Sequence, residues 1–448
     1  MHLDSESAPL GKEQSSYKRS STSIMEFIRT EAGGGLILVI CAAVALIWSN
    51  SRWSGDYFDL LQTPVQIGAR SFGLTMSLHH WINDALMVVF FLVVGLEIKR
   101  ELLIGELASR DKAAIPVAAA IGGAAIPALF YLALNRGDGK DGWGIPMATD
   151  IAFALGVLAL VASKAPIGLR VFLMALAIVD DLIAIMVIAV FYTSSIRFAP
   201  LGVAAGCLVI LIVMNRFQSG HPSFFFLIGI ILWLGLLKSG VHATIAGVLI
   251  AMCVPVSNHH SDDEFLDEMN ELVREYPGID EHEQRELVIT IEHIAERITP
   301  PAQRLIHTLH PWVAYLIIPV FAIANSGVAL DGASLTGPIP LGVLLGLVLG
   351  KPIGITLATA IMLRLGVGAL PKGMRFSHVP ALAALAGIGF TMSLFISDLA
   401  FESVSLIDEA KIGILVSSLI AAIVGSIAIW TTLRNGAEDP LSDQVVAA

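Results

Sequence analysis

Two adjacent aspartates, Asp180 and Asp181, lie at the middle of the apolar stretch Leu169–Tyr192, which is long enough to cross a bilayer. A carboxylate at the centre of a spanning helix costs roughly 2.5 to 3.5 kcal/mol on insertion scales, so such residues usually have a function. Neighbours on a helix point about 100° apart, which directs the two carboxylates to different surroundings. We therefore predict a functional site in which the two aspartates have different roles.

A lysine occurs at the same depth of another apolar stretch. Lys351 lies midway along Pro340–Leu363, and Pro352 after it removes one backbone hydrogen bond of the helix. A lysine buried at this depth either loses its proton or needs a counter-ion. We expect its partner to be one of the mid-membrane aspartates, either Asp150 or a member of the adjacent pair.

Asp150 follows the segment Gly144–Thr149, in which glycine and proline weaken a helix and Thr149 adds a hydroxyl group. Two interpretations stay open: a carboxylate that caps a helix at the membrane edge, or a helix broken within the bilayer. A second interrupted segment, 386–393, also has glycines followed by threonine. Two such breaks indicate a transporter with inverted repeats and a midplane site, although unrelated glycine-rich packing faces would give the same pattern.

The composition excludes a soluble protein of this size. Hydrophobic residues make up 55% of the 448 residues, charged residues 15%, and the mean hydropathy is +0.77. Apolar runs recur along the chain and predict an all-α polytopic membrane protein of about twelve transmembrane helices. The predicted spans are 33–50, 82–104, 113–135, 144–163, 169–192, 200–215, 222–237, 241–256, 311–330, 340–363, 380–400 and 409–432.

Placing both termini in the cytoplasm satisfies the positive-inside rule, because 15 lysines and arginines then lie on that side and 7 on the other. Lys411 is one of the seven. The chain then divides into a polar cytoplasmic tail (1–22), eight spans (23–256), an acidic cytoplasmic loop (257–308), four spans (309–432) and a second cytoplasmic tail (433–448).

Two pieces lie outside the spans. Pro64–Met76 alternates around glycine and predicts an external β-hairpin, although an ordinary loop is nearly as compatible. The acidic loop carries most of the formal net charge of −11. Its apolar residues recur at helical spacing on both sides of Pro277, which predicts two amphipathic helices. A solvated helical hairpin explains them, and a regulatory or docking element is an alternative. Nothing indicates a nucleic-acid partner.

Several motifs together resemble the NhaA-type bacterial sodium/proton antiporters. The matching segments are Asn83–Met87, Gly95–Leu102, Ala148–Gly156, Ala175–Leu182, Lys238–Thr244, His310–Tyr315 and Gly350–Pro352. The resemblance covers about residues 24–432. It implies two crossing interrupted helices, the fourth and the eleventh, at which like helix ends and their partial charges meet inside the bilayer.

The resemblance also implies roles for individual residues. Asp180 and Asp181 would bind the cation and protons with help from Thr149, while Asp150 and Lys351 would compensate the charges of the facing helix ends. Glu97, Arg100 and Glu101 would sense pH at the cytoplasmic funnel, and His242 would affect the pH response. From the residues alone, solvation at a helix end explains Glu97 and its charged neighbours slightly better than function does, and it explains Asp84 equally well. The acidic loop is longer than in the family's shorter members, so no pH-sensing position is transferred to it.

These residues predict exchange of Na⁺, and of Li⁺, for H⁺ at the bacterial inner membrane. Hard cations prefer oxygen ligands, and burial disfavours the charged carboxylate, so cation and proton compete for the same atoms. We expect no bound cofactor, a lipid environment, a pH-regulated electrogenic cycle and, by resemblance, a homodimer through the hairpin. A passive cation channel and an intramembrane aspartyl protease are the alternatives.

Overall fold

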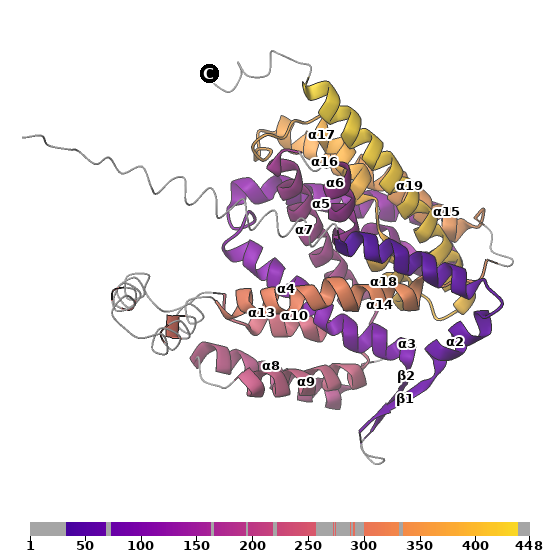
Figure 1. Cartoon of the computed structure of the whole chain (residues 1–448), viewed down its shortest axis with the longest axis vertical. Coiled ribbons are helices and arrows are strands. Elements are labelled where there is room, and N and C mark those ends of the chain that lie inside the picture. The colour runs from indigo at the N-terminus through magenta and orange to yellow at the C-terminus, as the bar shows by residue number, and fades with distance from the viewer. Residues whose placement is uncertain are drawn as a thin grey trace, which may run out of the picture.

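The structure is a computed structural model that describes residues 33–68, 73–162, 165–193, 196–217, 222–256, 300–330 and 335–437, with a few residues between 257 and 299. Most of these residues lie in helices (Figure 1). In these ranges, seven helices are long and apolar enough to cross a membrane, or ten if each bent helix pair counts as one span. The predicted class, a polytopic α-helical membrane protein, is confirmed.

The unbent helical segments follow one another along the chain. They are α3 (Leu78–Trp81), η1 (Ile82–Leu86) and α4 (Met87–Leu103); α5 (Arg110–Leu134); α7 (Ile167–Phe191); α8 (Phe198–Phe217); α9 (Pro222–Ser239); α10 (Ile245–Cys253); α13 (Pro301–Trp312), η4 (Val313–Ile317) and α14 (Ile318–Ser326); α15 (Pro338–Leu345), η5 (Gly346–Gly350) and α16 (Lys351–Arg364); and α19 (Val404–Ala437). The η1, η4 and η5 segments are single π-helical turns within longer helices, a feature frequent at functional sites.

Three helix pairs are bent. The first helix, Gly33–Ser49, turns by 110° into α2 (Ser54–Gln62). The 3₁₀ helix η2 (Gly137–Met147) meets α6 (Ile151–Val161) at 47°, and α17 (His378–Ala386) meets α18 (Phe390–Ala400) at 46°. The last two bends are the two interruptions expected from the sequence. All twelve predicted spans overlap helices of the structure, while their number as membrane crossings stays a prediction.

Three boundaries differ from the expected ones. The predicted span 311–330 belongs to a helical segment that begins at Pro301, because the amphipathic turns of α13 bury only Ala302 and Ile306 and are therefore missed in an apolar count. The predicted span 241–256 contains only the short helix α10, since Gly240 adopts a φ of +87° and a turn follows.

The third boundary corrects the placement of Lys411. The predicted span 409–432 belongs to α19, which begins at Val404, so Lys411 lies inside a helix and is 6% exposed. It was expected among the charges of the outer loops. A buried lysine needs a counter-ion, and the Lys411 ammonium lies 3.5 Å from an oxygen of Asp398.

Strands β1 (Pro64–Ile67) and β2 (Leu74–Ser77) pair antiparallel, with Pro64 opposite Ser77. They project from the molecule beside α2 in Figure 1. We call this the hairpin end, and the opposite end, where α4 finishes near Glu101, the Glu101 end. The residues at the tip between the two strands, most of the acidic loop, and the terminal segments 1–32 and 438–448 lie outside the described residues.

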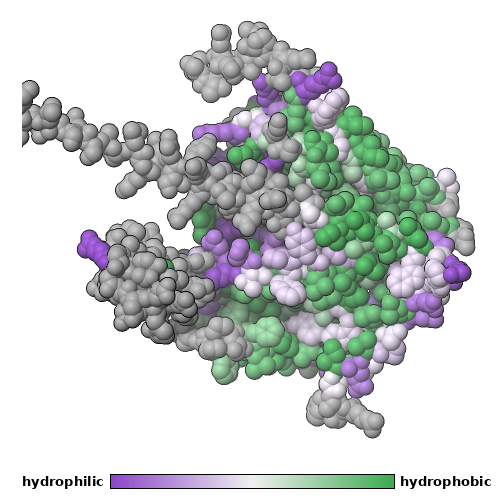
Figure 2. All heavy atoms as spheres, viewed as in Figure 1, coloured by the Kyte–Doolittle hydropathy of each residue, from purple (hydrophilic) through white to green (hydrophobic). Residues whose placement is uncertain are grey.

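The helices bury one large hydrophobic cluster and three smaller ones, and they expose apolar side chains around them. Hydrophobic residues cover much of the face that Figure 2 shows, and hydrophilic ones gather mainly towards its edges. On α19, for example, Leu419, Ile423 and Ile427 are each more than half exposed. An apolar belt of this kind is what a bilayer requires of the helices that face it.

Close helix packing sets the position of Lys351. A Cβ atom added to Gly354 on α16 would overlap the carbonyl oxygen of Gly122 on α5, and one added to Gly122 would overlap the Gly354 carbonyl. Small residues at both positions therefore let the two backbones touch. Lys351 begins α16 three residues before this contact, so the contact fixes the depth of its side chain.

Candidate functional site

Asp180 is held by two buried hydrogen-bond donors from other segments. The Lys351 ammonium lies 2.6 Å from its Oδ2 atom, and the Thr149 hydroxyl donates to the same oxygen at 2.7 Å. Lys351 is 1% exposed and Asp180 is 2% exposed, so the ion pair is fully buried. Burying such a pair is tolerated where hydrogen bonds replace the lost water. Asp180 is thus the counter-ion of Lys351, a choice that the sequence left open among three aspartates.

Asp181 is equally buried but differs in its contacts. Its side chain is 1% exposed, and its Oδ1 atom has no hydrogen-bond partner within the part of the chain that the structure describes. Unpaired oxygens of buried carboxylates are rare, and each suggests a functional group, an ion or a water molecule. The two adjacent carboxylates on α7 therefore differ in availability, as their angular separation on a helix predicts.

The two broken helix pairs cross beside these aspartates. Ala148 and Asp150 have extended backbones between η2 and α6, and the Asp150 N–H donates to the Ile388 carbonyl at 2.7 Å. Ile388 lies in the break between α17 and α18. The freed backbone groups of one break thus satisfy those of the other, which is the condition for non-helical backbone at membrane depth.

Asp150 lies between the N-termini of α6 and α18, which are the second helices of the two bent pairs. Its Oδ1 atom accepts a hydrogen bond from the Phe153 N–H of α6 at 2.9 Å. Its Oδ2 atom accepts from the Thr391 N–H of α18 at 3.0 Å and from the Thr391 hydroxyl at 2.5 Å. A carboxylate is favourable at the positive end of one helix dipole, and here it serves two. Asp150 therefore caps α6 at the break of a bent helix pair, and the depth of this break in the bilayer stays a prediction.

The C-terminal ends of η2 and α17, the first helices of the two bent pairs, lie near Lys351 and Thr149. The Lys351 ammonium donates to the Met147 carbonyl at the end of η2. The Thr149 hydroxyl oxygen lies 2.9 Å from the Ala386 carbonyl at the end of α17, so this carbonyl shares the single hydroxyl proton with Asp180. Carbonyl oxygens at these ends carry partial negative charge, which a cation compensates. The arrangement offers oxygen atoms of two carboxylates, one hydroxyl and two helix ends within one buried region.

A cavity of about 290 Å³ lies at the Glu101 end. Residues of α7, including Met174 and Ala175, line it together with Glu101 and Lys112. Ala175 precedes Asp180 by five residues, which is about 7 Å along the helix axis. Neither Asp180 nor Asp181 lines this cavity, which ends about one and a half turns of α7 before them.

The predicted pH-sensing residues separate into two groups. Arg100 and Glu101 form an ion pair at 3.0 Å beside this cavity, and Glu97 is half-buried one turn before Glu101 on α4. His242 lies at the other end, where its Nε2 atom is 2.5 Å from the Tyr192 carbonyl at the C-terminus of α7. The structure thus brings three of the four residues together and places His242 apart from them.

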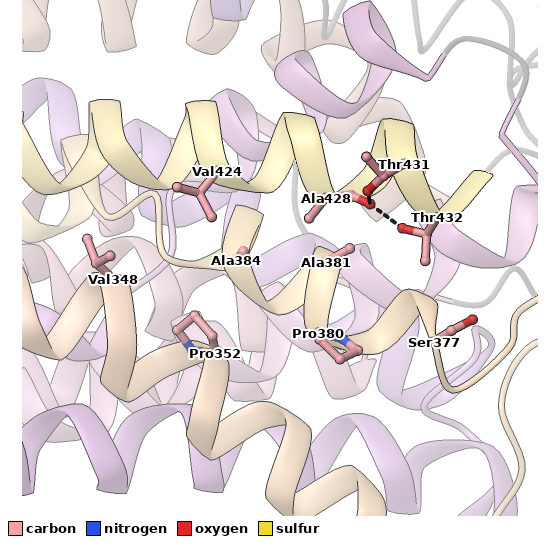
Figure 3. A pocket seen from close by; sticks show the side chains of 10 residues that line it. All are labelled: Val348, Pro352, Ser377, Pro380, Ala381, Ala384, Val424, Ala428, Thr431 and Thr432. Carbon is pink, nitrogen blue, oxygen red and sulfur yellow. Dashed lines mark hydrogen bonds between the residues drawn. The ribbon is translucent and has the colours of Figure 1, made fainter. Parts of the chain in front are cut away.

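A second cavity, of about 430 Å³, lies between α16, α17 and α19 (Figure 3). Its lining is mostly apolar, with Ala381, Ala384 and Ala428 between Val348 and Val424. None of the predicted ion-binding residues lines it, so we do not place the site there.

A polar cluster at the hairpin end was not predicted from the sequence, and two of its members, His79 and Asp398, are only partly buried, with side chains 28% and 11% exposed. Asp398 on α18 accepts a hydrogen bond from the Asn83 amide at 2.9 Å and lies 3.5 Å from both His79 and Lys411. Asp398 lies within the predicted span 380–400, and a carboxylate inside a predicted span is the sequence feature that could have identified it. Its partners come from distant parts of the chain, which no local pattern shows.

Comparisons with known proteins agree with the geometry. A family model described as Na+/H+ antiporter 1 matches residues 25–429. The Na(+)/H(+) antiporter NhaA of Citrobacter koseri is 47% identical over 407 residues, which are 89% of this chain and 95% of the relative. The NhaA antiporter of Escherichia coli strain K12 shows the same identity and coverage, and that of Koribacter versatilis is 45% identical over 93% of each chain. The chain therefore belongs to the Na+/H+ antiporter 1 family, whose members are transporters and not enzymes.

Proposed function

We propose that the protein exchanges Na⁺ for H⁺ across a membrane and that Asp181 and Asp180 bind both ions in turn. One observation carries the proposal: a buried carboxylate with an unpaired oxygen, Asp181, adjoins a second carboxylate that a lysine neutralises. The names of the NhaA relatives support the ions. Li⁺ is a second substrate by its similar preference for oxygen ligands.

The exchange follows from competition for the same oxygens. At alkaline pH on the cytoplasmic side the carboxylates lose protons, and Na⁺ enters through the cavity near Glu101. The cation binds Asp181 and draws Asp180 away from Lys351, while the Thr149 hydroxyl turns its oxygen to the ion. The loaded site then opens to the other side, where protons displace the cation. Because the site holds either ion but not both, the two movements are coupled. Asp180 and Asp181 are adjacent, so their proton release is a property of the pair and not of either residue alone.

Several finer features belong to the same proposal. The chain crosses the bacterial inner membrane twelve times as two inverted repeats, with both termini in the cytoplasm and the hairpin end outside. The charge asymmetry of the loops supports this orientation. More than one proton moves per cation, which makes exchange electrogenic. Glu97, Arg100 and Glu101 tune the pH response near the inner cavity, and two protomers associate through the β1–β2 hairpin.

The alternatives fit the site less well. An aspartyl protease needs one carboxylate from each of two segments sharing a proton, whereas Asp180 and Asp181 stand side by side on α7 and Lys351 binds one of them. A passive channel needs a continuous pore with rings of ligands, whereas the aspartates here lie in a packed helix crossing.

Proteoliposomes with an imposed pH gradient test the proposal. Adding Na⁺ outside should collapse the gradient in vesicles that contain the native chain, and Asp181→Asn should leave it unchanged. Gly206→Ala on α8, where an added Cβ atom meets no atom within 4 Å, serves as the control and should behave like the native chain. A gradient that Na⁺ does not disturb, or Na⁺ uptake without proton movement, would contradict antiport.

A further inference from the structure

The polar cluster at the hairpin end joins four helical segments through one carboxylate. Asp398 on α18 contacts Asn83 in η1, His79 in α3 and Lys411 in α19. Asn325 at the end of α14 completes the cluster, since it exchanges hydrogen bonds with Asn83 at 2.9 and 3.2 Å and lies 3.0 Å from His79. We call these five residues the Asp398 cluster. Each member is bonded to at least one other, so the cluster ties the segments together.

The helix α18 connects this cluster to the proposed ion site. Its first turn carries Thr391, which donates to Asp150 at the helix crossing. Asp398 lies seven residues later, which is two turns or about 10 Å along the same helix. A movement of α18 that opens the crossing towards the hairpin end therefore also has to move Asp398 relative to its partners.

An aromatic layer lies between the two positions. Phe395 packs with Phe91 of α4 at a centroid distance of 5.4 Å and with Phe321 of α14 at 6.2 Å. All three side chains are at most 2% exposed. Phe321 precedes Asn325 by one turn, and Phe395 precedes Asp398 by nearly one turn. The helices α18 and α14 are thus in contact at two levels: first through the phenylalanines, and then, nearer the hairpin end, through the Asp398 cluster.

We propose that Asp398 is the positioning residue of a gate at the hairpin end: its contacts hold α18 against α3, η1 and α19, and through Asn83 against α14, and they close the route from that side to Asp181. The inference rests on the proposed function, because a gate has meaning only for a site that opens alternately. Asp398 is partly buried, with one hydrogen-bond donor at 2.9 Å and a lysine and a histidine at 3.5 Å, and these contacts separate together when the carboxylate moves.

Labelling of a buried cysteine from outside tests the gate without requiring transport. Ser393→Cys supplies the reporter, because Ser393 is fully buried on α18 on the site side of Phe395. It is placed in a chain whose Cys41, Cys207 and Cys253 are alanine. A membrane-impermeant cationic thiosulfonate is added to right-side-out vesicles, and the labelling rate is measured. A separate chain with Ser403→Cys, at an exposed position after α18, confirms that the reagent meets the hairpin end.

We expect Asp398→Asn to raise the labelling rate of the reporter about tenfold or more, since hydrogen bonds to a charged group are among the stronger ones. Glu402→Gln is the matched control: it also removes one carboxylate near the end of α18, but from an exposed position, and should leave the rate unchanged. Equal rates in the native and Asp398→Asn chains would overturn the proposal.

A second variant covers a failure of Asp398→Asn to reach the membrane. That substitution leaves the buried Lys411 ammonium without a carboxylate, whereas Asp398→Asn combined with Lys411→Met removes both charges. The double variant should show the same acceleration. If labelling is faster in Asp398→Asn but the native chain does not exchange Na⁺ for H⁺, the closure by Asp398 is supported and the proposed function is contradicted. Normal exchange with unchanged labelling would contradict the gate alone.

Discussion

The Lys351 ammonium lies 2.6 Å from the Asp180 carboxylate, and neither side chain is more than 2% exposed. This ion pair makes the adjacent aspartates unequal. Asp180 has a cationic partner and a hydroxyl donor, whereas Asp181 retains an unpaired oxygen. In the proposed exchange, a cation that enters the site therefore binds Asp181 first, and Asp180 follows by giving up Lys351.

Separating this pair should be costly, and removing both members should be less so. Lys351→Met leaves an uncompensated buried carboxylate, which costs about 3 to 5 kcal/mol where the protein cannot neutralise it. We expect a lower thermal unfolding temperature in detergent for Lys351→Met and partial recovery when Asp180→Asn is added. The native chain, Lys351→Met, Asp180→Asn and the double variant form a double-mutant cycle. Purely additive effects would show that the two side chains do not interact in the membrane protein.

Thr149 should affect cation affinity more than the maximal rate. Thr149→Val keeps the shape but removes the hydroxyl whose single proton Asp180 and the Ala386 carbonyl share. In the proposed cation-bound site this hydroxyl oxygen is a ligand of the ion, so its loss should raise the KM for Na⁺ about tenfold, which corresponds to about 1.4 kcal/mol. Thr149→Ser retains the hydroxyl and should stay near the native value in the same exchange assay. A KM that is equal in Thr149→Val would remove Thr149 from the site.

Asp150 should stabilise the helix crossing through two N-termini at once. Asp150→Ala removes the acceptors for Phe153 and Thr391, and each lost cap costs about 0.5 to 2 kcal/mol. Ser77→Ala is the matched control, because Ser77 caps only α3, by accepting from the His80 N–H at 3.3 Å. Thermal unfolding should show a clearly larger loss for Asp150→Ala than for Ser77→Ala. Equal losses would mean that Asp150 does not serve both helices.

The contact between Gly354 and Gly122 should not tolerate a methyl group. Gly354→Ala forces α16 away from α5, and overpacking of this kind costs about 1 to 3 kcal/mol. The same shift moves Lys351, so exchange should fall together with stability. Gly206→Ala on α8 meets no atom within 4 Å and should be neutral or slightly stabilising, because alanine favours a helix. Unchanged exchange in Gly354→Ala would show that this contact does not position the lysine.

The charged residues of the site were predictable because the bilayer makes them conspicuous. Asp180, Asp181 and Lys351 each interrupt a long apolar stretch near its middle, and the glycines near Asp150 indicate a break. The pairing among them was not predictable from spacing. Asp150 and Thr391 are 241 residues apart in the sequence, and only the crossing of two breaks joins them.

The Asp398 cluster was also not predictable from the sequence. Asp398 and Lys411 sit near the ends of predicted spans, where solvation is the ordinary explanation of a charge. Their burial depends on His79, Asn83 and Asn325, which arrive from two other helical segments. The amphipathic start of α13 was missed for a related reason, because burial of a few residues on one face does not raise the mean hydropathy of a segment.

Proton release on cation binding tests the central claim most directly. The purified protein, in weakly buffered detergent solution near the onset of exchange, is mixed with NaCl while a pH indicator records released protons, and choline chloride serves as the control salt. The account predicts saturable release in the native chain and in Gly206→Ala, and none in Asp181→Asn. Release that persists in Asp181→Asn, or Na⁺ binding by the native chain without release, would contradict competition of cation and proton for Asp181.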